Sequence, residues 1–128
     1  PPAGKFGEWH YCILKPTKGV EPYDKPVAVL MDGDCFSATD IFLGALKGWR
    51  NVTLVGTRSG GGSGRPVRFG LTASGIGIRL SSMASFRPDG NLYDGRGIEP
   101  DVEVQVKMAD FVGKSDAQLE AALKRIRK

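Results

Sequence analysis

Residues 26–40 read P-V-A-V-L-M-D-G-D-C-F-S-A-T-D, and this stretch decides the fold. Its first six residues form a continuous apolar run, which predicts a strand covered on both faces near the centre of a parallel sheet. The D-G-D sequence at residues 32–34 breaks the run. From residue 37 to residue 49 apolar residues recur at helical spacing, so the chain is expected to form a strand, a tight turn and a helix.

The residues that follow extend this unit into an α/β fold. Residues 52–56 (V-T-L-V-G) predict a second buried strand and complete a parallel β-α-β crossover. Residues 58–64 (R-S-G-G-G-S-G) cannot hold a regular element and predict a loop whose backbone is closely approached by another group. Residues 67–71 and 76–82 alternate around T-A-S-G, which predicts an added β-hairpin.

Three further elements are expected towards the ends of the chain. Residues 7–15 are aromatic and β-branched and predict a strand that contains His10, the one histidine, as an ordinary half-buried side chain. Residues 102–106 alternate as a short strand. Ser115 and Gln118 have capping-box spacing and predict the start of a C-terminal helix.

The composition is that of one globular domain. The chain has 128 residues, 41% of them hydrophobic and 25% charged, and we expect a single unit with neither a membrane span nor a leader segment. Its net charge of +4 is concentrated at residues 124–128, which favours a solvated helix face over a nucleic-acid surface. Cys12 and Cys35 lack the spacing of metal ligands, so they are two buried thiols or one bridge.

Ser37 is the candidate nucleophile, because it lies at the strand-to-helix turn where free N–H groups and the helix dipole favour negative charge. The N–H group of Ala38 would then donate to the oxyanion of an acyl-transfer intermediate. A second interpretation stays open: Ser37 and Asp40 also fit a capping box, in which the hydroxyl would contribute about 1 kcal/mol of helix stability. The local pattern does not separate the two.

Four motifs occur together in this chain: S-A-T-D at residues 37–40, L-V-G-T-R at 54–58, a glycine-rich loop at 60–64 and G-R-G-I-E-P-D at 95–101. In order and spacing they resemble the tail-specific, or C-terminal processing, serine peptidases over residues 25–106. The resemblance implies a ClpP/crotonase-like α/β fold and hydrolysis of peptide bonds through an acyl-enzyme on Ser37.

One departure from the family pattern concerns the general base. Members with a Ser/Lys dyad carry a lysine at the position of Gly62, and no lysine lies between Lys47 and Lys107 here. The chain is therefore similar to the tricorn-core-like branch, which uses serine, histidine and an acid. The acid corresponds to Asp94, which is otherwise simply a turn-forming residue. The histidine and a second oxyanion glycine of that branch come earlier in the chain than these residues, so His10 is not expected to be the base.

The resemblance also implies a substrate and partners. Gly60, Gly61 and Gly62 are expected to line the cleft for a polypeptide substrate. The chain would be the C-terminal, nucleophile-bearing part of a catalytic domain, would need the upstream part of that domain as its partner, and would lack the family's PDZ module. The resemblance implies no cofactor, metal or nucleic acid, and it leaves the oligomeric state undecided. It points to the periplasm or the cell envelope as the location. The fragment alone is either inactive or completed by a separate chain.

Two other functions fit the same fold. The first is a non-catalytic module that binds a ligand or peptide, as in the interphotoreceptor retinoid-binding proteins, because a fold alone does not establish chemistry. The second is a crotonase-type acyl-CoA enzyme. That alternative is less favoured, because Ser37 stands where an oxyanion glycine would be more natural.

Overall fold

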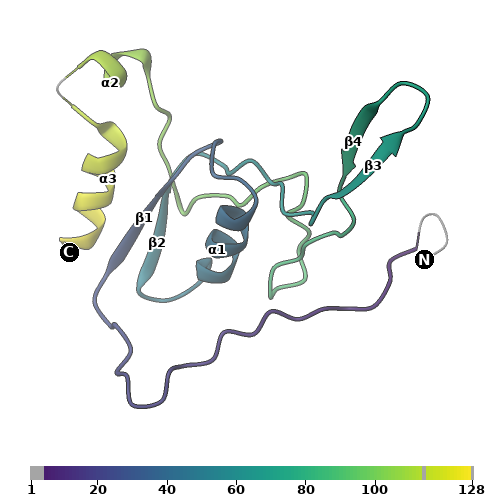
Figure 1. Ribbon diagram of the computed structural model, residues 1–128. Helices are drawn as coiled ribbons and strands as arrows, with labels where there is room; N and C mark the ends of the chain where they lie inside the picture. The colour runs from purple at the N-terminus through teal and green to yellow at the C-terminus, as the bar shows by residue number, and fades with distance from the viewer. Residues whose placement is uncertain (1–4, 114, 128) are drawn as a thin grey trace.

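The computed structural model describes residues 5–113 and 115–127. Eight helices and strands lie within those residues, and Figure 1 shows their arrangement. In chain order they are β1 (Val27–Met31), α1 (Ala38–Leu46), β2 (Val52–Gly56), β3 (Val67–Leu71), β4 (Ile76–Leu80), β5 (Val102–Glu103), α2 (Met108–Val112) and α3 (Ala117–Ile126). The predicted β-α-β unit, hairpin and C-terminal helix are confirmed. The predicted strand at residues 102–106 is confirmed only at its first two residues, and α2 was not predicted.

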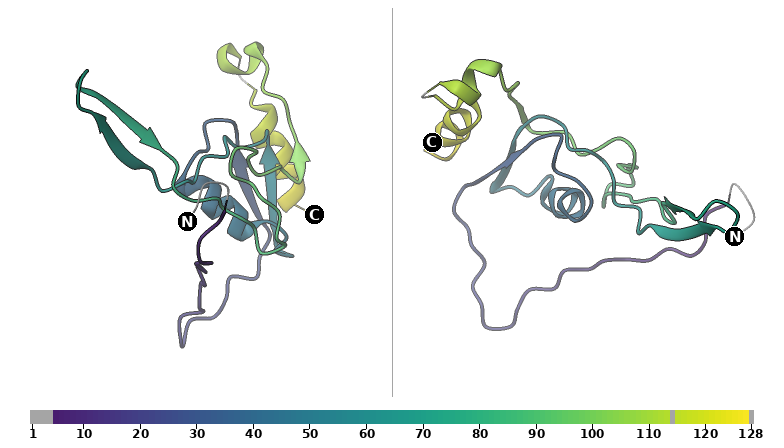
Figure 2. Two further views of the ribbon diagram at one scale, coloured as in Figure 1. Left: turned by 90° about the vertical axis from the view of Figure 1, so that its right-hand side faces the viewer. Right: turned by 45° about the horizontal axis from the view of Figure 1, so that its top comes forward.

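The parallel sheet has the order β1-β2-β5, with β1 joined to β2 in register from Val27 opposite Val52. Within the described residues β2 is therefore the central strand and β1 is an edge strand, so the prediction that residues 26–31 lie at the centre is wrong. The apolar run has another cause. Helices α1 and α3 lie on opposite faces of β1 and β2 (Figures 1 and 2), and a strand covered on both faces is apolar throughout wherever it lies in the sheet.

The hydrophobic core lies between the sheet and α1. Its buried members are Met31 from β1, Leu43 from α1, Leu54 from β2, and Tyr93 and Ile98 from the segment that precedes β5. Ile98 is the isoleucine of the G-x-G-I-x-P-D motif, so packing anchors this motif beside the sheet.

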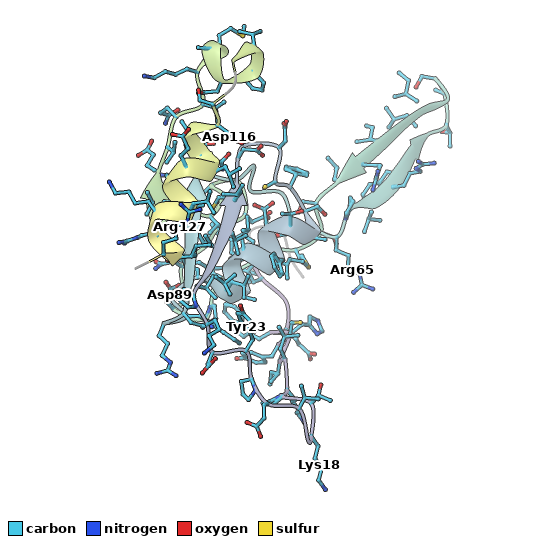
Figure 3. All side chains as sticks on the ribbon, turned by 90° about the vertical axis from the view of Figure 1, so that its left-hand side faces the viewer. Lys18, Tyr23, Arg65, Asp89, Asp116 and Arg127 are labelled. Carbon is cyan, nitrogen blue, oxygen red and sulfur yellow. The ribbon has the colours of Figure 1, made fainter. Side chains whose placement is uncertain are left out.

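Helix α3 begins one residue later than the predicted capping box would place it. Its N-cap is Asp116, whose carboxylate accepts a hydrogen bond from Leu119 N–H at 2.9 Å, and Ser115 is not the cap. Gln118 is instead partly buried against the sheet, where its side-chain amide donates to the carbonyls of Met31 (2.8 Å) and Val55 (2.9 Å). Figure 3 shows Asp116 at one end of α3 and Arg127 at the other.

Strands β3 and β4 pair in antiparallel register from Val67 opposite Leu80, and the hairpin projects away from the core (Figures 1 and 2). At its base Ser82 N–H donates to Gly64 O at 2.8 Å and Ser82 Oγ donates to Arg65 O at 2.6 Å. Arg65, labelled in Figure 3, lies where the hairpin leaves the core. The hairpin is thus attached directly to the end of the glycine-rich loop.

The strand predicted at residues 7–15 is not formed. The segment has no regular secondary structure and no strand of the described chain pairs with it. Its aromatic contacts are made by Phe6 and Trp9, whose ring centroids lie 6.1 and 5.1 Å from that of Phe86. His10 is exposed, so the prediction of a half-buried histidine is also wrong. A β-prone sequence becomes a strand only where it pairs with the edge of another strand, and this segment pairs with none of the described strands.

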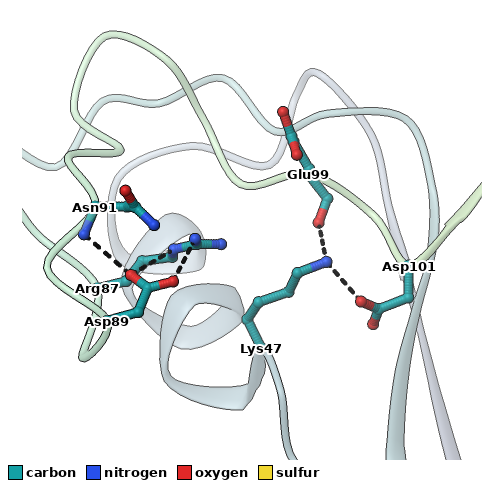
Figure 4. Close-up of polar contacts among 6 residues, drawn as sticks. All are labelled: Lys47, Arg87, Asp89, Asn91, Glu99 and Asp101. Atoms are coloured by element: carbon teal, nitrogen blue, oxygen red, sulfur yellow. Dashed lines mark hydrogen bonds and ion pairs between the residues drawn. The ribbon is translucent and has the colours of Figure 1, made fainter.

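Two polar clusters fasten the turns around the core (Figure 4). Lys47 at the end of α1 donates to Glu99 O at 2.9 Å and pairs with the Asp101 carboxylate. The other carboxylate oxygen of Asp101 accepts from Leu54 N–H at 2.8 Å, so the last residue of the G-x-G-I-x-P-D motif ties α1 to β2. In the second cluster the hydrogen bond from Asn91 N–H lowers the pKa of the exposed Asp89 carboxyl, which also pairs with Arg87.

Candidate active site

The turn that carries Ser37 is built by Asp32. Its carboxylate oxygen Oδ1 accepts hydrogen bonds from the N–H groups of Asp34 (3.0 Å) and Cys35 (3.2 Å), which closes the chain on itself after β1. Aspartate side chains commonly fold the backbone in this way. The turn places Ser37 immediately before the first residue of α1, at the carboxyl end of β1, which is the edge of an open α/β sheet where ligands bind.

Ser37 has a backbone conformation that residues other than glycine rarely adopt. Its φ is 62° and its ψ is −112°, and such a conformation costs roughly 1–3 kcal/mol. The residue is exposed, and its side chain makes no capping hydrogen bond within the described chain. Ser37 therefore occupies the N-cap position without using its hydroxyl as a cap. An exposed serine on a strained strand-to-helix turn is the usual arrangement of a nucleophile.

Ala38 supplies a backbone donor beside this hydroxyl. It is the first residue of α1 and is exposed. The N–H group of Thr39 donates to Phe36 O at 3.3 Å, and that of Ile41 donates to Ser37 O at 3.3 Å. Over residues 5–113 and 115–127 the N–H group of Ala38 has no acceptor. It is available to an anionic oxygen at the positive end of the helix dipole.

Asp40 joins the Ser37 turn to the glycine-rich loop. Its side chain is fully buried. One carboxylate oxygen accepts from Ser37 N–H (2.8 Å) and Gly62 N–H (2.9 Å). The other accepts from Ser59 Oγ (2.6 Å) and Gly61 N–H (3.0 Å). The sequence showed Asp40 only as the second half of a capping box. Ser59, the serine directly before the glycine tract, is the sequence feature that could have indicated a polar contact with Asp40.

Phe36 covers the outer face of the glycine-rich loop. Gly60 N–H donates to Cys35 O at 2.9 Å, which holds the loop against the Ser37 turn. A Cβ atom at Gly60 would lie 2.7 Å from the Phe36 ring, and one at Gly62 would overlap the same ring. The position that carries a lysine in Ser/Lys dyads thus faces an aromatic side chain. A side chain at Gly62 would require the exposed Phe36 ring to move.

Asp94 lies at the far end of the same loop. It is half-buried, and its carboxylate accepts a hydrogen bond from Ser63 N–H at 3.2 Å. Gly95 N–H donates to Gly61 O at 2.6 Å, and the turn itself is closed by a hydrogen bond from Arg96 N–H to Tyr93 O at 2.9 Å. The structure thus brings Ser37 and Asp94 to the two ends of one loop. No hydrogen bond joins them within the described residues, and Asp94 also serves as the turn former.

The two thiols lie in different parts of the chain: Cys35 belongs to the Ser37 turn, and Cys12 belongs to the irregular segment before β1. Cys12 is exposed, Cys35 is partly buried, and both are free, which excludes a bridge and the prediction of two buried thiols. Burial raises the pKa of the Cys35 thiol. Among residues 5–113 and 115–127 no group of three or more potential metal ligands comes together. In those residues no helix is long and apolar enough to cross a membrane.

The same residues match a known family. A model of peptidase family S41 aligns with residues 11–104, a range that includes Ser37, the glycine-rich loop and Asp94. This chain belongs to peptidase family S41. A carboxy-terminal-processing protease of Bartonella bacilliformis is 35% identical over 82 residues, which are 64% of this chain and 19% of that protein. The resemblance to C-terminal processing serine peptidases is confirmed.

Solved structures show the same fold. A candidate peptidase of Parabacteroides merdae superposes with a TM-score of 0.75 and 30% identity, over 83% of this S41 chain and 33% of that chain. The tricorn protease superposes with a TM-score of 0.66 over 80% of this chain and 11% of its own. At 22% identity the tricorn protease shows the fold alone. The expected ClpP/crotonase-like α/β fold is confirmed. The chain spans about a fifth of the length of the curated relatives it matches.

Proposed function

We propose that this S41 chain carries the nucleophile of a serine peptidase, with Ser37 as the attacking residue. The observation that supports the proposal best is the conformation of Ser37. Its φ of 62° presents an exposed hydroxyl that makes no cap within the described chain. An ordinary helix cap would need neither the strained backbone nor a free hydroxyl. Membership of family S41 supports the same chemistry.

The proposed reaction is acyl transfer. Ser37 Oγ attacks the carbonyl carbon of the scissile peptide bond, and a general base takes the hydroxyl proton and returns it to the leaving amine. Water then hydrolyses the ester on Ser37. The N–H group of Ala38 donates to the oxyanion together with a second donor. Transfer of this proton is the step that residues 1–128 do not complete by themselves.

The general base in this proposal is a histidine outside residues 1–128, oriented by Asp94 as in a Ser-His-acid triad. Two observations support that choice. Gly62 faces the Phe36 ring where a dyad lysine would stand, and Asp94 is fixed by Ser63 N–H at the end of the loop that begins beside Ser37. His10 lies in the irregular segment before β1 and is exposed, which does not favour it as the base.

The proposed substrate is a polypeptide, and the name of the Bartonella relative points to the C-terminal region of proteins. Gly60 and Gly62 would line the cleft beside Ser37 next to the Phe36 ring, whereas Gly61 is buried against the turn at Gly95 and would support the cleft from behind. Their N–H groups already donate to Cys35 O and Asp40. A peptide would therefore touch the carbonyl groups and Cα atoms of this loop and would find its backbone donors elsewhere.

A fluorophosphonate probe tests the proposal, because it phosphonylates serine hydroxyl groups that are activated for attack. The whole protein that carries this chain should be labelled at Ser37, as located by peptide mass spectrometry. The Ser37→Ala variant should lose both labelling and peptide hydrolysis while keeping its melting temperature. Ser115→Ala is the matched control, because Ser115 is an exposed serine before α3. Absence of labelling at Ser37 in the active, folded protein would contradict the proposal and favour a binding module.

A further inference from the structure

Asp40 is the only fully buried carboxylate among residues 5–113 and 115–127. All four of its neighbours donate to it: three backbone N–H groups and one hydroxyl. A carboxylate has about four lone-pair sites when it is ionised, so this set satisfies an ionised Asp40 completely. Hydrogen bonds to an ionised acceptor are also shorter and stronger than neutral ones. A capping box alone would use only one of these four contacts.

Ser59 extends the contacts of Asp40 to the G-R-G-I-E-P-D motif at residues 95–101. Its hydroxyl donates to Asp40 and accepts from Ile98 N–H at 2.7 Å, while its own N–H donates to Ile98 O at 3.0 Å. The buried carboxylate thereby connects the Ser37 turn, the glycine-rich loop and the segment that follows Asp94. Residues far apart in the sequence share this single acceptor.

The contact with Ser37 decides which conformation that residue can adopt. In an ordinary capping box the serine hydroxyl accepts from the N–H group of the residue in Asp40's place. Here the side chain of Asp40 accepts from Ser37 N–H, and the Ser37 hydroxyl makes no cap. The Gly61 and Gly62 amides hold the same carboxylate from the other side, so it cannot turn away without losing them.

We propose that Asp40 is a positioning residue that holds Ser37 in its left-handed conformation and sets the glycine-rich loop at a fixed place beside the hydroxyl. The proposal deepens the function above and rests on Ser37 being the nucleophile. Without this acceptor Ser37 would relax to an ordinary N-cap, with its hydroxyl on the first turn of α1. The hydroxyl would then be bound to the helix and lost to attack.

Asp40→Asn in the whole protein is the sharpest test. An amide keeps the shape of the carboxylate but replaces one acceptor oxygen by an N–H₂ donor, so at least one amide of the Ser37 turn or the loop loses its partner. A crystal structure of the variant should show Ser37 at a negative φ with its hydroxyl on the helix. The rate constant of fluorophosphonate labelling at saturating reagent should fall roughly tenfold to a hundredfold, with little change in the apparent affinity for the reagent.

Asp101→Asn is the matched control. Asp101 also accepts from a backbone N–H group, that of Leu54, at 2.8 Å, but it does not contact the Ser37 turn. The Asp101→Asn variant should lose thermal stability, and its folded form should keep the wild-type rate constant for labelling. The proposal is overturned if Asp40→Asn keeps both the φ of Ser37 and the wild-type rate. It is also overturned if Asp101→Asn slows labelling as much.

Ser59→Ala decides the matter if Asp40→Asn does not fold. It removes one of the four donors and leaves the contact between Asp40 and Ser37 N–H in place, so a smaller loss of labelling is expected with a measurable shift of the glycine-rich loop. Wild-type labelling and an unmoved loop in this variant would then overturn the proposal. Failure of the wild-type protein to label at Ser37 would instead contradict the proposed function, while the crystal structure of Asp40→Asn would still report whether Asp40 holds Ser37.

Discussion

The α/β core and the two outlying segments of this chain contain similar apolar residues in opposite surroundings. In the core Leu43 and Leu54 are 1% and 0% exposed. In the segment before β1 Trp9 is 63% exposed, and in the β3–β4 hairpin Phe69 is 52% exposed. The residues that carry the family motifs all belong to the core or to the loops that touch it. Figure 1 shows the two outlying segments leading away from it.

The difference shows that a hydrophobic sequence becomes buried only where the same chain supplies a surface to cover it. The core has two helices and two turns around a small sheet, and these bury Met31, Leu43, Leu54, Tyr93 and Ile98 together. The aromatic and aliphatic side chains of the outlying segments stay largely exposed, even where Phe6 and Trp9 contact Phe86, and exposed apolar surface of this kind is typical of interaction sites. The stability of the 128-residue chain should therefore come from the core.

The largest effect is expected from truncating a core side chain. Leu54→Ala should lower the free energy of unfolding of the 128-residue chain by about 2–5 kcal/mol, because Leu54 is fully buried between α1 and the sheet. Phe69→Ala, in the hairpin, should change it by about 0.5 kcal/mol or less. Urea unfolding of both variants measures the contrast. Equal losses would mean that the hairpin packs on the core in solution.

The next effect compares two glycines that both have positive φ, of which Gly61 is buried and Gly75 is exposed. Gly75 in the hairpin turn has φ of 68°, nothing lies within 4 Å of a Cβ atom added there, and Gly75→Ala should cost about 1–2 kcal/mol. Gly61 has φ of 71°, and a Cβ atom there would overlap Gly97 N and lie 2.9 Å from Arg96 N. Gly61→Ala should cost about 1–3 kcal/mol more than Gly75→Ala. Similar losses of unfolding free energy for the two variants, measured by calorimetry, would contradict the tight packing of the glycine-rich loop at Gly61.

A smaller effect is expected when the hydrogen bond that Asp101 accepts from the backbone is compared with its ion pair to Lys47. Asp101→Ala leaves Leu54 N–H without its acceptor and should cost about 1–3 kcal/mol. Lys47→Met removes only the partly exposed ion pair and the contact with Glu99 O, and should cost about 0.2–1 kcal/mol, with less effect at high salt. Urea unfolding at two salt concentrations distinguishes them. A larger loss for Lys47→Met would show that the ion pair dominates.

The smallest expected difference is in the alkylation rates of two thiols, Cys12 in the segment before β1 and Cys35 in the Ser37 turn. Iodoacetamide should label Cys12 faster than Cys35 at neutral pH, because Cys12 is exposed whereas burial raises the pKa of the Cys35 thiol and lowers its thiolate fraction. Raising the pH until the Cys35 thiol is also ionised should bring the two rates closer. Mass spectrometry of timed digests follows both sites. Faster labelling of Cys35 would mean that the Ser37 turn opens in solution.

Local patterns predicted the elements whose partners are neighbours in the chain. The strand, turn and helix around Ser37 and the β3–β4 hairpin were confirmed because each is specified by residues within a short stretch. The prediction of a strand at residues 7–15 was wrong because strand formation depends on pairing with another strand that lies far away in the sequence. The cap of α3 was off by one residue, because Asp116 is the N-cap and its carboxylate accepts from Leu119 N–H.

The sequence by itself determined the α/β unit, the place of Ser37 at a strand-to-helix turn and, through four spaced motifs, the family. Only the tertiary structure decided that Asp40 is a shared acceptor for Ser37 and the glycine-rich loop, that Phe36 fills the space beside Gly62, and that Asp94 meets Ser63. The physical reason is the range of the interactions: periodicity and capping act over a few residues, whereas a buried carboxylate finds its donors wherever the folded chain brings them.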